Sequence, residues 1–505
     1  MSNELSEQEI IRRQGLEELR KMGINPYPSE LFPVNAYASH IKLSFDSQPE
    51  NFAEVCLAGR LMSKRIMGKA SFAELKDSSG RIQLYINRDE ICSGDDKELY
   101  NTVFKRLLDL GDYIGVKGYV FKTQVGEISV HVKELIVLAK SLRPLPVVKT
   151  DADGNIYDAF ADPELRFRMR YVDLVVNDHV KDTFLKRSRM IHSIRDFLNV
   201  QGALEVDTPV LQSIPGGAAA RPFITHHNAL DMPLYLRIAN ELYLKRLIVG
   251  GFDWVYEFSR NFRNEGMDRT HNPEFTILEF YVAYKDYYWM MEQTEQMLEK
   301  VCMDVNGTTE IPSGTDTLSF KAPFRRISLY DAIQEHTGVD VSQMNEDALR
   351  NLCKKFHIET DNTMGRGKLI DELFSETCEK HFIQPTFIID YPIEMSPLTK
   401  KHRHKEGLVE RFELMVNGKE IANAYSELND PIDQYERFLE QVKLMERGDD
   451  EAMFIDHDFI RSMEYGMPPM SGIGIGIDRL AMLMTNQSTI QEVLFFPQMR
   501  PEKPE

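Results

Sequence analysis

Apolar and polar residues alternate in five short runs between residues 55 and 138. The runs read VCLAGRLMSKRI, SFAELKD, SSGRIQLYIN, YIGVKGYVFKT and EISVHVKELIVL, and turns that contain glycine separate them. A period of two is typical of strands, because successive side chains of a strand point to opposite faces. The pattern therefore predicts five strands. Their number and length fit a small closed barrel of the OB type and a plain β-sandwich equally well.

Helical spacing replaces this alternation in three other parts of the chain. Residues 6–22 place their apolar side chains near helical spacing, and Gly23 ends that pattern. The run at 187–211 predicts a long helix, a stop at Gly202 and a strand that ends at Pro209. From 329 to 381 the pattern is again mainly helical.

A change of composition near residue 145 predicts a domain boundary. The stretch Arg143–Pro146 carries two prolines, and the acidic, glycine-containing stretch TDADGN follows it. Prolines stiffen a connection, and the acidic stretch has nothing to bury, so this is expected to be a linker.

Length and composition are those of a soluble globular enzyme with about three domains. The chain has 505 residues, of which 42% are apolar and 28% charged. The longest apolar stretches fall far short of the roughly 18 residues that span a membrane, and the first residues lack the apolar core of a secretory signal. A cytoplasmic protein without a membrane segment is expected. Five widely spaced cysteines without a CxxC pair predict neither a disulfide framework nor a zinc site.

Charge is distributed unevenly along the chain. The net charge is −19 overall, yet residues 55–149 contain 16 Lys and Arg against 11 Asp and Glu, which gives +5 for this segment. A small basic module on a large acidic body could bind a polyanion at one end and carry out different chemistry at the other. Chance fluctuation over 95 residues explains the same charges about as well.

A strand, a polar loop and a second strand are expected in EFSRNFRNEGMDRTHNPEFTILEFYVAY. Along an extended chain Arg263 and Glu265 share one face, as Glu279 and Tyr281 do on the returning strand. A guanidinium is suited to phosphate or carboxylate, and a neighbouring carboxylate can accept hydrogen bonds from an amino group. The alternative is an exposed, ion-paired hairpin.

Asn417-Gly418 predicts a two-residue hairpin turn between apolar alternations. In that register Val416 pairs with Lys419, Met415 with Glu420, and Glu413 with Ala422. Glu413 and Glu420 are then diagonal neighbours on one face. Two carboxylates repel unless a cation lies between them, so oxygen ligands beside a phosphate-binding arginine favour Mg²⁺ bridging a nucleotide. The alternative is a pair of solvated glutamates.

Strict alternation along the second hairpin strand conflicts with a single shared site. It would direct Asn423 and Glu427 to the face opposite Glu420. A bulge in the region 422–425 is therefore required if all of them line one site.

The segment SGIGIGIDRLAMLMT alternates glycines with isoleucines before an amphipathic helix. The isoleucines can pack on one face, while the glycines leave the other face open to a flat ligand. Asp478 is expected to cap this helix, and Arg479 to emerge at its positive end, where an anion would bind. No GxxxxGK[ST], GxGxxG or HExxH motif occurs.

Together these motifs resemble those of a known enzyme family. TPVL after a long helix, FRNE with its loop to HNPEF, and GIGIGIDR resemble the three ordered motifs of class II aminoacyl-tRNA synthetases. The stretches IPGGAAARPFITHHNAL and YSELND make the chain similar to the bacterial lysyl-tRNA synthetases. The resemblance extends from about residue 55 to residue 500. It implies an α+β fold, with an antiparallel catalytic sheet flanked by helices and an N-terminal all-β OB-fold barrel.

The resemblance also implies a two-step reaction with ATP, L-lysine and tRNA(Lys), through a lysyl-adenylate. Arg263 would bind the α-phosphate and the substrate carboxylate, and Arg479 the γ-phosphate, as the catalytic residues. The rest of the ATP site would be Glu265, His271, Asn272 and Phe275. Glu413 and Glu420 match the family's ligands for Mg²⁺.

The remaining assignments by resemblance concern lysine and tRNA. Lysine would be bound by Gly217, Glu241, Glu279, Tyr281, Asn423 and Glu427, with Tyr281 and Glu427 at the ε-amino group and Gly217 and Glu241 near the α-amino group. Arg65, Phe72 and Gln83 match the family's anticodon readers, and an aromatic side chain beside basic groups suits stacking on an unpaired base. The long helix and the TPVL strand would form a homodimer interface.

The expected domains are a helical extension (1–50), an OB-fold anticodon-binding domain (51–145), a linker (146–160) and a catalytic domain (161–500) with a helical insertion near 329–381. Two alternatives remain: a class II ligase for aspartate or asparagine, and a non-catalytic RNA-binding protein with a decayed synthetase body. The presence of all five of Arg263, Glu265, Glu413, Glu420 and Arg479 argues against decay.

Overall fold

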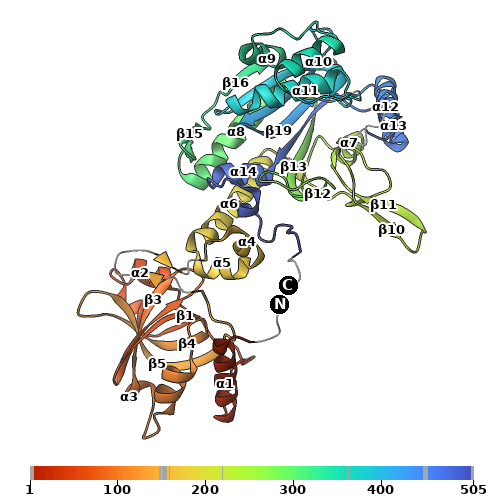
Figure 1. Ribbon diagram of the computed structural model, residues 1–505. Coiled ribbons are helices and arrows are strands. Elements are labelled where there is room, and N and C mark those ends of the chain that lie inside the picture. Colours follow the sequence, from red (N-terminus) through yellow and green to blue (C-terminus); the bar gives the residue numbers. More distant parts are fainter. Residues whose placement is uncertain are drawn as a thin grey trace. The chain divides into compact units, whose positions relative to one another are not determined.

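The computed structural model divides the chain into two compact units, residues 1–161 with 501–505, and residues 162–500 (Figure 1). The residues that the structure describes are 5–146, 149–150, 156–157, 160–218, 220–361, 363–446 and 453–501. None of the helices in these ranges is long and apolar enough to cross a membrane.

The first unit begins with the predicted amphipathic helix, α1 (Glu7–Lys21). Ser6 caps it: the Ser6 hydroxyl accepts a hydrogen bond from the Glu9 amide, and the Glu9 carboxylate accepts one from the Ser6 amide. This reciprocal pairing satisfies two backbone donors that a helix start otherwise leaves free. Two short helices, α2 (Ala38–Ser44) and α3 (Arg88–Ile91), follow later in the unit.

Five strands close into a barrel, which confirms the barrel prediction and rules out the sandwich. They are β1 (Val55–Met67), β2 (Ala70–Lys76), β3 (Arg81–Asn87), β4 (Tyr113–Lys122) and β5 (Ile128–Ala139), in the order β1-β2-β3-β5-β4. The first half of β1 pairs with β4 and its second half with β2, so the sheet has no free edge. A π-helical segment, Leu99–Leu107, buries Tyr100 and Phe104 in the barrel core, an element that the sequence pattern did not predict.

The structure describes only part of the predicted linker. Residues 151–155, most of the acidic stretch, lie outside the described residues. Two short strands, β6 (Lys149–Thr150) and β7 (Ile156–Tyr157), pair on either side of them.

The second unit is built on an eight-stranded sheet in the order β16-β17-β18-β19-β20-β13-β12-β8. All neighbouring strands are antiparallel except β16/β17 and β12/β8. The strands are β8 (Leu204–Glu205), β12 (Trp254–Phe262), β13 (Glu274–Ala283), β16 (Arg325–Ser328), β17 (Thr386–Pro392), β18 (Leu408–Val416), β19 (Lys419–Ser426) and β20 (Met470–Gly476).

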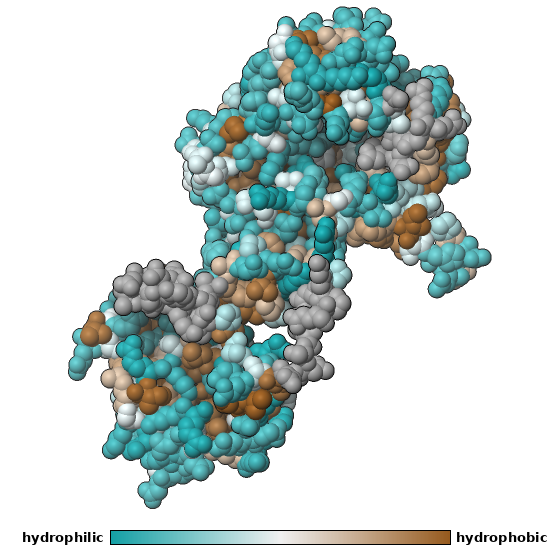
Figure 2. Space-filling model, in the orientation of Figure 1, coloured by the Kyte–Doolittle hydropathy of each residue, from teal (hydrophilic) through white to brown (hydrophobic). Residues whose placement is uncertain are grey.

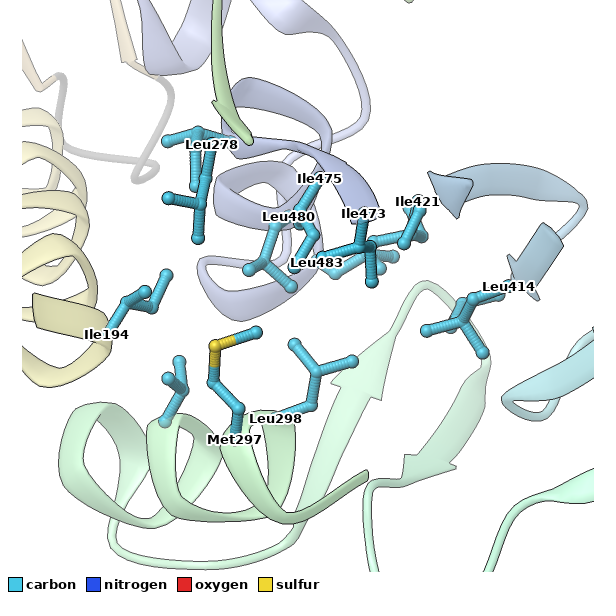
Figure 3. Close-up of a cluster of buried hydrophobic side chains, with 14 of the residues drawn as sticks. Ile194, Leu278, Met297, Leu298, Leu414, Ile421, Ile473, Ile475, Leu480 and Leu483 are labelled. Carbon is cyan, nitrogen blue, oxygen red and sulfur yellow. The ribbon is translucent and has the colours of Figure 1, made fainter. Parts of the chain in front are cut away.

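Three helices cover one face of this sheet: α6 (Asp178–Val200), α8 (Tyr287–Asn306) and α14 (Ile477–Met484). Figure 3 shows Ile194 of α6 and Leu298 of α8 directed toward Leu480 of α14 and Ile473 of β20. Because this face is filled by the core, polar side chains on the same strands point to the opposite face.

Among the described residues of this unit, ten further α-helices and strands lie around the sheet. They are α4 (Pro163–Arg168), α5 (Arg170–Val176), β9 (Leu211–Gln212), β10 (Ile224–His227), β11 (Met232–Leu236), α7 (Glu241–Val249), β14 (Glu310–Ser313), β15 (Asp316–Ser319), α12 (Pro431–Glu446) and α13 (His457–Glu464). The predicted helical stretch at 329–381 is confirmed as α9 (Leu329–Thr337), α10 (Glu346–Lys355) and α11 (Arg366–Thr377), which share a core of their own.

One strand differs from its prediction. The strand after Gly202 comprises only β8, two residues that pair in parallel with β12, and it does not extend to Pro209. The helix before it is longer than expected and starts at Asp178. Gly202 does end that helix region, in a backbone conformation with a φ of 88° that favours glycine.

Candidate active site

A cavity of about 1890 Å³ opens on the sheet face opposite the core. Side chains from β13, β18, β19, β20, α7 and the loop after β12 line it. It brings together thirteen of the residues singled out from the sequence: Gly217, Glu241, Arg263, Glu265, His271, Asn272, Phe275, Glu279, Tyr281, Glu413, Glu420, Asn423 and Arg479. Residues more than 260 positions apart in the chain therefore share one site.

Arg263 lies at the end of β12 with its guanidinium over an aromatic ring. The pattern predicted that Arg263 and Glu265 share one face of an extended chain. Strand β12 ends at Phe262, however, so both residues lie in the loop that follows it. The Arg263 amide donates to the Pro273 carbonyl oxygen at 2.9 Å, and its guanidinium carbon lies 5.1 Å from the centre of the Phe275 ring. Within the described residues the buried Arg263 Nε has no hydrogen-bond partner, which leaves a donor for a ligand.

An exposed turn orients His271 toward Arg479. The Asp268 carboxylate accepts hydrogen bonds from the amides of Thr270 and His271 at 2.6 and 2.7 Å, and its other oxygen lies 2.8 Å from His271 Nδ1. These contacts outweigh partial burial and hold the pKa of Asp268 below its ordinary value. The other ring nitrogen, Nε2, lies 2.9 Å from Arg479 Nη2. Asn272 donates from Nδ2 to the Glu274 carbonyl oxygen at 2.6 Å.

The β18–β19 hairpin has the predicted turn but not the predicted register throughout. Val416 pairs with Lys419 and Met415 with Glu420, as expected, and Asn417 and Gly418 both have positive φ. Beyond that point the register shifts, so that Leu414 pairs with Ala422 and Glu413 with Asn423, not with Ala422.

The shift is a bulge at Ile421, one residue before the region where one was expected. Ile421 and Ala422 are both buried in the core, so the alternation of faces is interrupted there. As a result Glu420 and Asn423, three residues apart, both line the cavity. The need for a bulge is confirmed, and its predicted position is wrong.

The two candidate metal ligands differ in their surroundings. Glu413 is largely buried and accepts a hydrogen bond from Arg411 Nη2 at 2.5 Å. Burial, with a contribution from nearby Glu420, raises the pKa of Glu413 to about 7 against the opposing effect of Arg411. Glu420 is more exposed and lies 3.6 Å from Arg479. Arg411 also donates to Asn423 Oδ1 at 3.0 Å, so it holds one side chain on each strand of the hairpin, Glu413 on β18 and Asn423 on β19.

The donor set at Glu413 and Glu420 fits a magnesium ion shared with a nucleotide. Both offer only carboxylate oxygens, and Mg²⁺ is commonly held by one or two carboxylates together with substrate phosphates. In the described part of the chain no group of three or more His, Cys, Asp or Glu is arranged to hold a metal by itself. The remaining ligands would therefore have to come from substrate or water.

The glycine strand β20 is bare on the cavity side, as predicted. Ile473 and Ile475 pack in the core, and Gly472, Gly474 and Gly476 line the cavity. A Cβ added at Gly472 would lie 2.2 Å from Tyr281 Cε1 and 2.4 Å from Glu427 Oε1, so the backbone there approaches both side chains too closely for any other residue.

Asp478 was predicted to cap helix α14, and this prediction is wrong. The capping position is Gly476, and Asp478 lies two residues further on, buried. Its carboxylate accepts hydrogen bonds from Arg187 Nη2 at 2.6 Å and from the Thr276 amide at 2.7 Å. Asp478 thus ties α14 to α6 and β13 and holds the helix start beneath the cavity. Arg479 emerges from this start and donates from Nη1 to the Glu420 carbonyl oxygen at 2.8 Å.

Three buried carboxylates and two tyrosines form a second compartment of the site, around Glu241. Tyr425 donates its hydroxyl to Glu241 Oε1 at 2.7 Å, and Tyr281 donates to Glu279 Oε2 at 3.2 Å. Glu427 lies beside Gly472, below the cavity surface, and is almost fully buried. Gly217, with a φ of 86°, passes over Glu241, since a Cβ there would lie 3.0 Å from Glu241 Cβ.

Burial raises the pKa of two of these carboxylates, Glu279 and Glu427. It raises the pKa of Glu279 to about 8, with a further contribution from nearby Glu241. It also raises the pKa of Glu427 well above its ordinary value, although the neighbouring Lys245 opposes this effect.

Lys245 belongs to this compartment and was not predicted. Its ammonium, completely buried, lies 2.5 Å from Glu241 Oε1 and forms an ion pair with Glu427. The sequence signal is a lysine four residues after a glutamate on one helix, a spacing that ordinary surface ion pairs share. Arg411 and Tyr425 were also missed, and each lies two residues from a predicted site residue.

The three candidate tRNA-binding residues lie together on the barrel of the first unit. Arg65 of β1 pairs with Phe72 of β2, and Phe72 pairs in turn with Tyr85 of β3, with ring centres 5.4 Å apart. Gln83, two residues before Tyr85, therefore faces the same side and accepts a hydrogen bond from Ser129 at 2.9 Å.

The sequence matches two family descriptions over these same regions. Residues 162–500 match "tRNA synthetases class II (D, K and N)", and residues 55–138 match "OB-fold nucleic acid binding domain". These matches agree with the barrel and the antiparallel sheet, and they confirm the predicted α+β fold class.

Similar curated proteins cover nearly the whole chain. A protein of Porphyromonas gingivalis named lysine–tRNA ligase is 69% identical over 502 residues, which are 99% of this chain and 86% of that protein. Proteins of the same name from Christiangramia forsetii and Azobacteroides pseudotrichonymphae are 65% and 64% identical, over 99% of this chain in each case and over 87% and 99% of the relatives. The chain therefore belongs to the class II aminoacyl-tRNA synthetases and, within them, to the lysine–tRNA ligase family.

Proposed function

We propose that this protein joins L-lysine to tRNA(Lys) in two steps at the expense of ATP. In the first step the lysine carboxylate attacks the α-phosphate of ATP, which gives lysyl-adenylate and releases pyrophosphate. In the second step the terminal ribose hydroxyl of the tRNA attacks the adenylate carbonyl and releases AMP. One observation carries the proposal: a single cavity places a compartment rich in buried carboxylates next to one lined by arginines.

Arg263 and Arg479 would bind the nucleotide phosphates. Arg263 lines the cavity that both compartments share, so it could contact both the α-phosphate and the lysine carboxylate, and its unpartnered buried Nε supports a ligand there. Phe275, whose ring lies against the Arg263 guanidinium, would stack on adenine, and Glu265 would accept from the adenine amino group. Arg479, oriented by the Glu420 carbonyl and His271, would bind the γ-phosphate, with Asn272 completing the site.

Lysine would occupy the carboxylate compartment. Its two ammonium groups need acceptors, and Glu241, Glu279 and Glu427 provide buried carboxylates for them. Gly217 and Glu241 would face the α-amino group, and Tyr281 and Glu427 the ε-amino group, with Asn423 between the compartments. An aspartate or asparagine side chain would instead require a cation or amide donors, and the only ammonium among the described residues of this compartment, Lys245, is already paired with two carboxylates.

Mg²⁺ is the divalent cation that best suits Glu413 and Glu420. When bound, it would neutralise phosphate charge that develops during pyrophosphate release. The protein's own contribution is to fix both carboxylates: Arg411 holds Glu413, and the bulge at Ile421 directs Glu420 into the cavity. Catalysis would then rest on positioning and on charge stabilisation by Arg263 and Arg479, without a covalent enzyme intermediate.

The barrel would bind the anticodon of tRNA(Lys). Phe72 offers a partly exposed ring for stacking, Arg65 a cation and Gln83 an amide on the same face. We assign the anticodon-binding domain to residues 51–145, after a helical extension at 1–50 and before a linker at 146–160. The catalytic domain comprises residues 161–500, with the helical insertion near 329–381.

A homodimer in the cytoplasm is the form in which we expect the enzyme to work. Apolar side chains are exposed on α5, on α6 and in the segment that follows them, and Figure 2 shows hydrophobic atoms at several places on the surface. These exposed side chains are Tyr171, Leu185, Val200, Leu204, Val210 and Leu211. Val200, at the end of α6, is 88% exposed.

The proposal is tested by charging unfractionated tRNA with each labelled amino acid in the presence of ATP and Mg²⁺. Lysine alone should become acid-precipitable with tRNA, and the accepting species should carry the lysine anticodon. In the same assay Glu427→Gln should lose lysine-dependent activity, because its neutral amide cannot balance the ε-ammonium. Full activity of Glu427→Gln with lysine would show that the ε-amino assignment is wrong.

A further inference from the structure

Lys245 occupies the same compartment as the proposed lysine substrate. It is the fifth residue of helix α7, one turn after Glu241, and its side chain has no exposure to solvent. Its ammonium contacts Glu241 Oε1 at 2.5 Å and also pairs with Glu427, so a cation of the protein itself joins two of the three carboxylates assigned to substrate.

The ammonium is enclosed on its other sides by aromatic rings. It lies 5.5 Å from the ring centre of Tyr425, 5.9 Å from that of Phe459 on α13 and 6.0 Å from that of Tyr281. Such rings stabilise a cation through their negative faces. The Lys245 side chain is fully buried among these rings and is paired with two carboxylates. It is therefore a fixed part of the compartment.

Lys245 engages only part of each carboxylate. On Glu427 its contact is to Oε2, while Oε1 lies toward Gly472. On Glu241 both Lys245 and Tyr425 contact Oε1, so Oε2 is left for another donor. A carboxylate has two oxygens with about four acceptor sites, so a substrate ammonium can bind beside Lys245 without displacing it.

Charge counting shows what the internal cation achieves. Glu241, Glu279 and Glu427, if ionised, carry three negative charges, and Lys245 reduces this to two. Free lysine brings two ammonium groups, and its carboxylate belongs with Arg263 on the other side. The compartment with Lys245 thus matches the substrate, whereas without it one buried carboxylate would have no counter-ion.

A buried carboxylate without a counter-ion takes up a proton instead of remaining charged. Burial and the neighbouring Glu241 and Glu279 already raise the pKa of Glu427, and Lys245 is the group that opposes them. The pKa of Lys245 is itself raised: burial lowers it, but Glu241 and Glu427 outweigh that effect, so the ammonium stays charged. The other titratable groups facing this cluster are Tyr281 and Tyr425, together with Glu257, which is paired with Arg237, and Arg411.

We propose that Lys245 is a positioning residue that acts as the internal counter-ion of the lysine site: it holds Glu241 and Glu427 in place and reduces their negative charge, so that they select a substrate ammonium. This inference rests on the proposed function and deepens it, because it names a residue that sets specificity without contacting the reacting atoms.

The test compares Lys245→Met with wild type in lysine-dependent ATP–pyrophosphate exchange. At about pH 7 the KM for lysine should rise on the order of tenfold to a hundredfold, as expected when one member of a buried charge pair is removed, while the KM for ATP changes by less than about twofold. Because Glu427 without Lys245 should keep its proton to higher pH and then ionise, the KM for lysine should fall more steeply with pH in the variant than in wild type. The preference for lysine over 6-hydroxynorleucine, its uncharged ε-hydroxyl analogue, should also decrease.

Arg246→Met is the matched control. Arg246 is the next residue of α7, and its guanidinium pairs with Asp456 at 2.7 Å and not with the cavity carboxylates. Its removal should change neither the KM for lysine nor its pH dependence. An unaltered KM and pH profile in Lys245→Met would overturn the proposal, as would an equal loss in the lysine and ATP constants, which would indicate only a damaged fold.

Two further measurements test the proposal if Lys245→Met does not fold. Lys245→Gln, which keeps a hydrogen-bond donor without the charge, should show the same selective effects. Calorimetry in buffers of different ionisation enthalpy should detect the release of more protons per lysine bound near pH 7 in Lys245→Gln than in wild type, because Lys245 is the group that lowers the pKa of Glu427. An equal release of protons in the two proteins would contradict the proposal. Absence of any lysine-dependent exchange in wild type would instead refute the proposed function itself.

Discussion

Arg479 Nη2 lies 2.9 Å from His271 Nε2, so the first turn of helix α14 is joined to the loop between β12 and β13. The same guanidinium donates from Nη1 to the Glu420 carbonyl oxygen at 2.8 Å. Arg479 therefore connects the loop, the helix and the bulged hairpin at the end of the cavity assigned to the ATP phosphates.

Replacing Arg479 with lysine tests this connection. A lysine ammonium keeps the positive charge but cannot donate in two directions from a planar group. We expect the KM for ATP in pyrophosphate exchange to rise about tenfold to a hundredfold, with the KM for lysine nearly unchanged. Equal increases in both constants would mean that Arg479 supports the fold of the whole cavity and not the ATP half.

Lysine binding should release a proton through Glu279. Its folded-state pKa is raised to about 8, so at about pH 7 this carboxyl is mostly protonated in the free protein. A bound ammonium favours the ionised form, lowers the pKa and expels the proton. Lysine affinity should therefore increase as pH rises from about 6.5 toward 8 and level off above the free-state pKa.

Calorimetric titration with lysine in two buffers of different ionisation enthalpy measures this proton. The release should approach one proton near pH 7 and become small about one unit above pH 8. Glu279→Gln cannot release it and should bind lysine with a flatter pH dependence. A wild-type protein that releases no proton near pH 7 would show that Glu279 is already ionised before lysine binds.

The hairpin turn offers a test of the metal site at a distance. Gly418 has a φ of 66°, and a Cβ there would lie 3.3 Å from Lys380 Cα. Gly418→Ala should cost about 1 kcal/mol of unfolding free energy. It should also raise the Mg²⁺ concentration for half-maximal exchange by on the order of tenfold, because the turn sets where Glu420 lies.

Gly314→Ala is the control for this effect. Gly314 has a φ of 60° at the turn of the β14–β15 hairpin, and a Cβ there would contact nothing within 4 Å. It should show a similar loss of stability without a change in Mg²⁺ dependence. An equal shift in Mg²⁺ dependence for both variants would mean that the turn at Gly418 has no specific effect on the metal site.

Phe72→Ala separates the two halves of the reaction. Loss of the ring removes base stacking worth about 1–3 kcal/mol, so the KM for tRNA in charging should rise about tenfold to a hundredfold. Lysine-dependent pyrophosphate exchange needs no tRNA and should keep its wild-type rate. Equal losses in both assays would contradict the assignment of anticodon binding to the barrel.

Much of this architecture could be predicted from sequence where local patterns decide it. The five alternating runs gave the barrel strands, and Asn417-Gly418 gave the turn, because period and positive φ are local properties. The glycines of β20 likewise indicated a bare strand face. Each of these features depends on residues within about ten positions of one another, which pattern analysis can compare.

The parts that were missed depend on contacts between distant segments. The bulge at Ile421 follows from packing two consecutive side chains into the core, which alternation does not encode. Asp478 suited a helix cap by residue type, yet its partners are Arg187 and Thr276, far away in sequence. Lys245 resembles a surface lysine until the fold buries it beside Glu427.

The central claim is that the carboxylate compartment selects lysine for activation. The most direct measurement is ATP–pyrophosphate exchange by the 505-residue protein with Mg²⁺ and each of the twenty amino acids in turn. We predict exchange with lysine that exceeds exchange with every other amino acid, aspartate and asparagine included. Exchange driven by aspartate or asparagine, or by none of the twenty, would contradict this account.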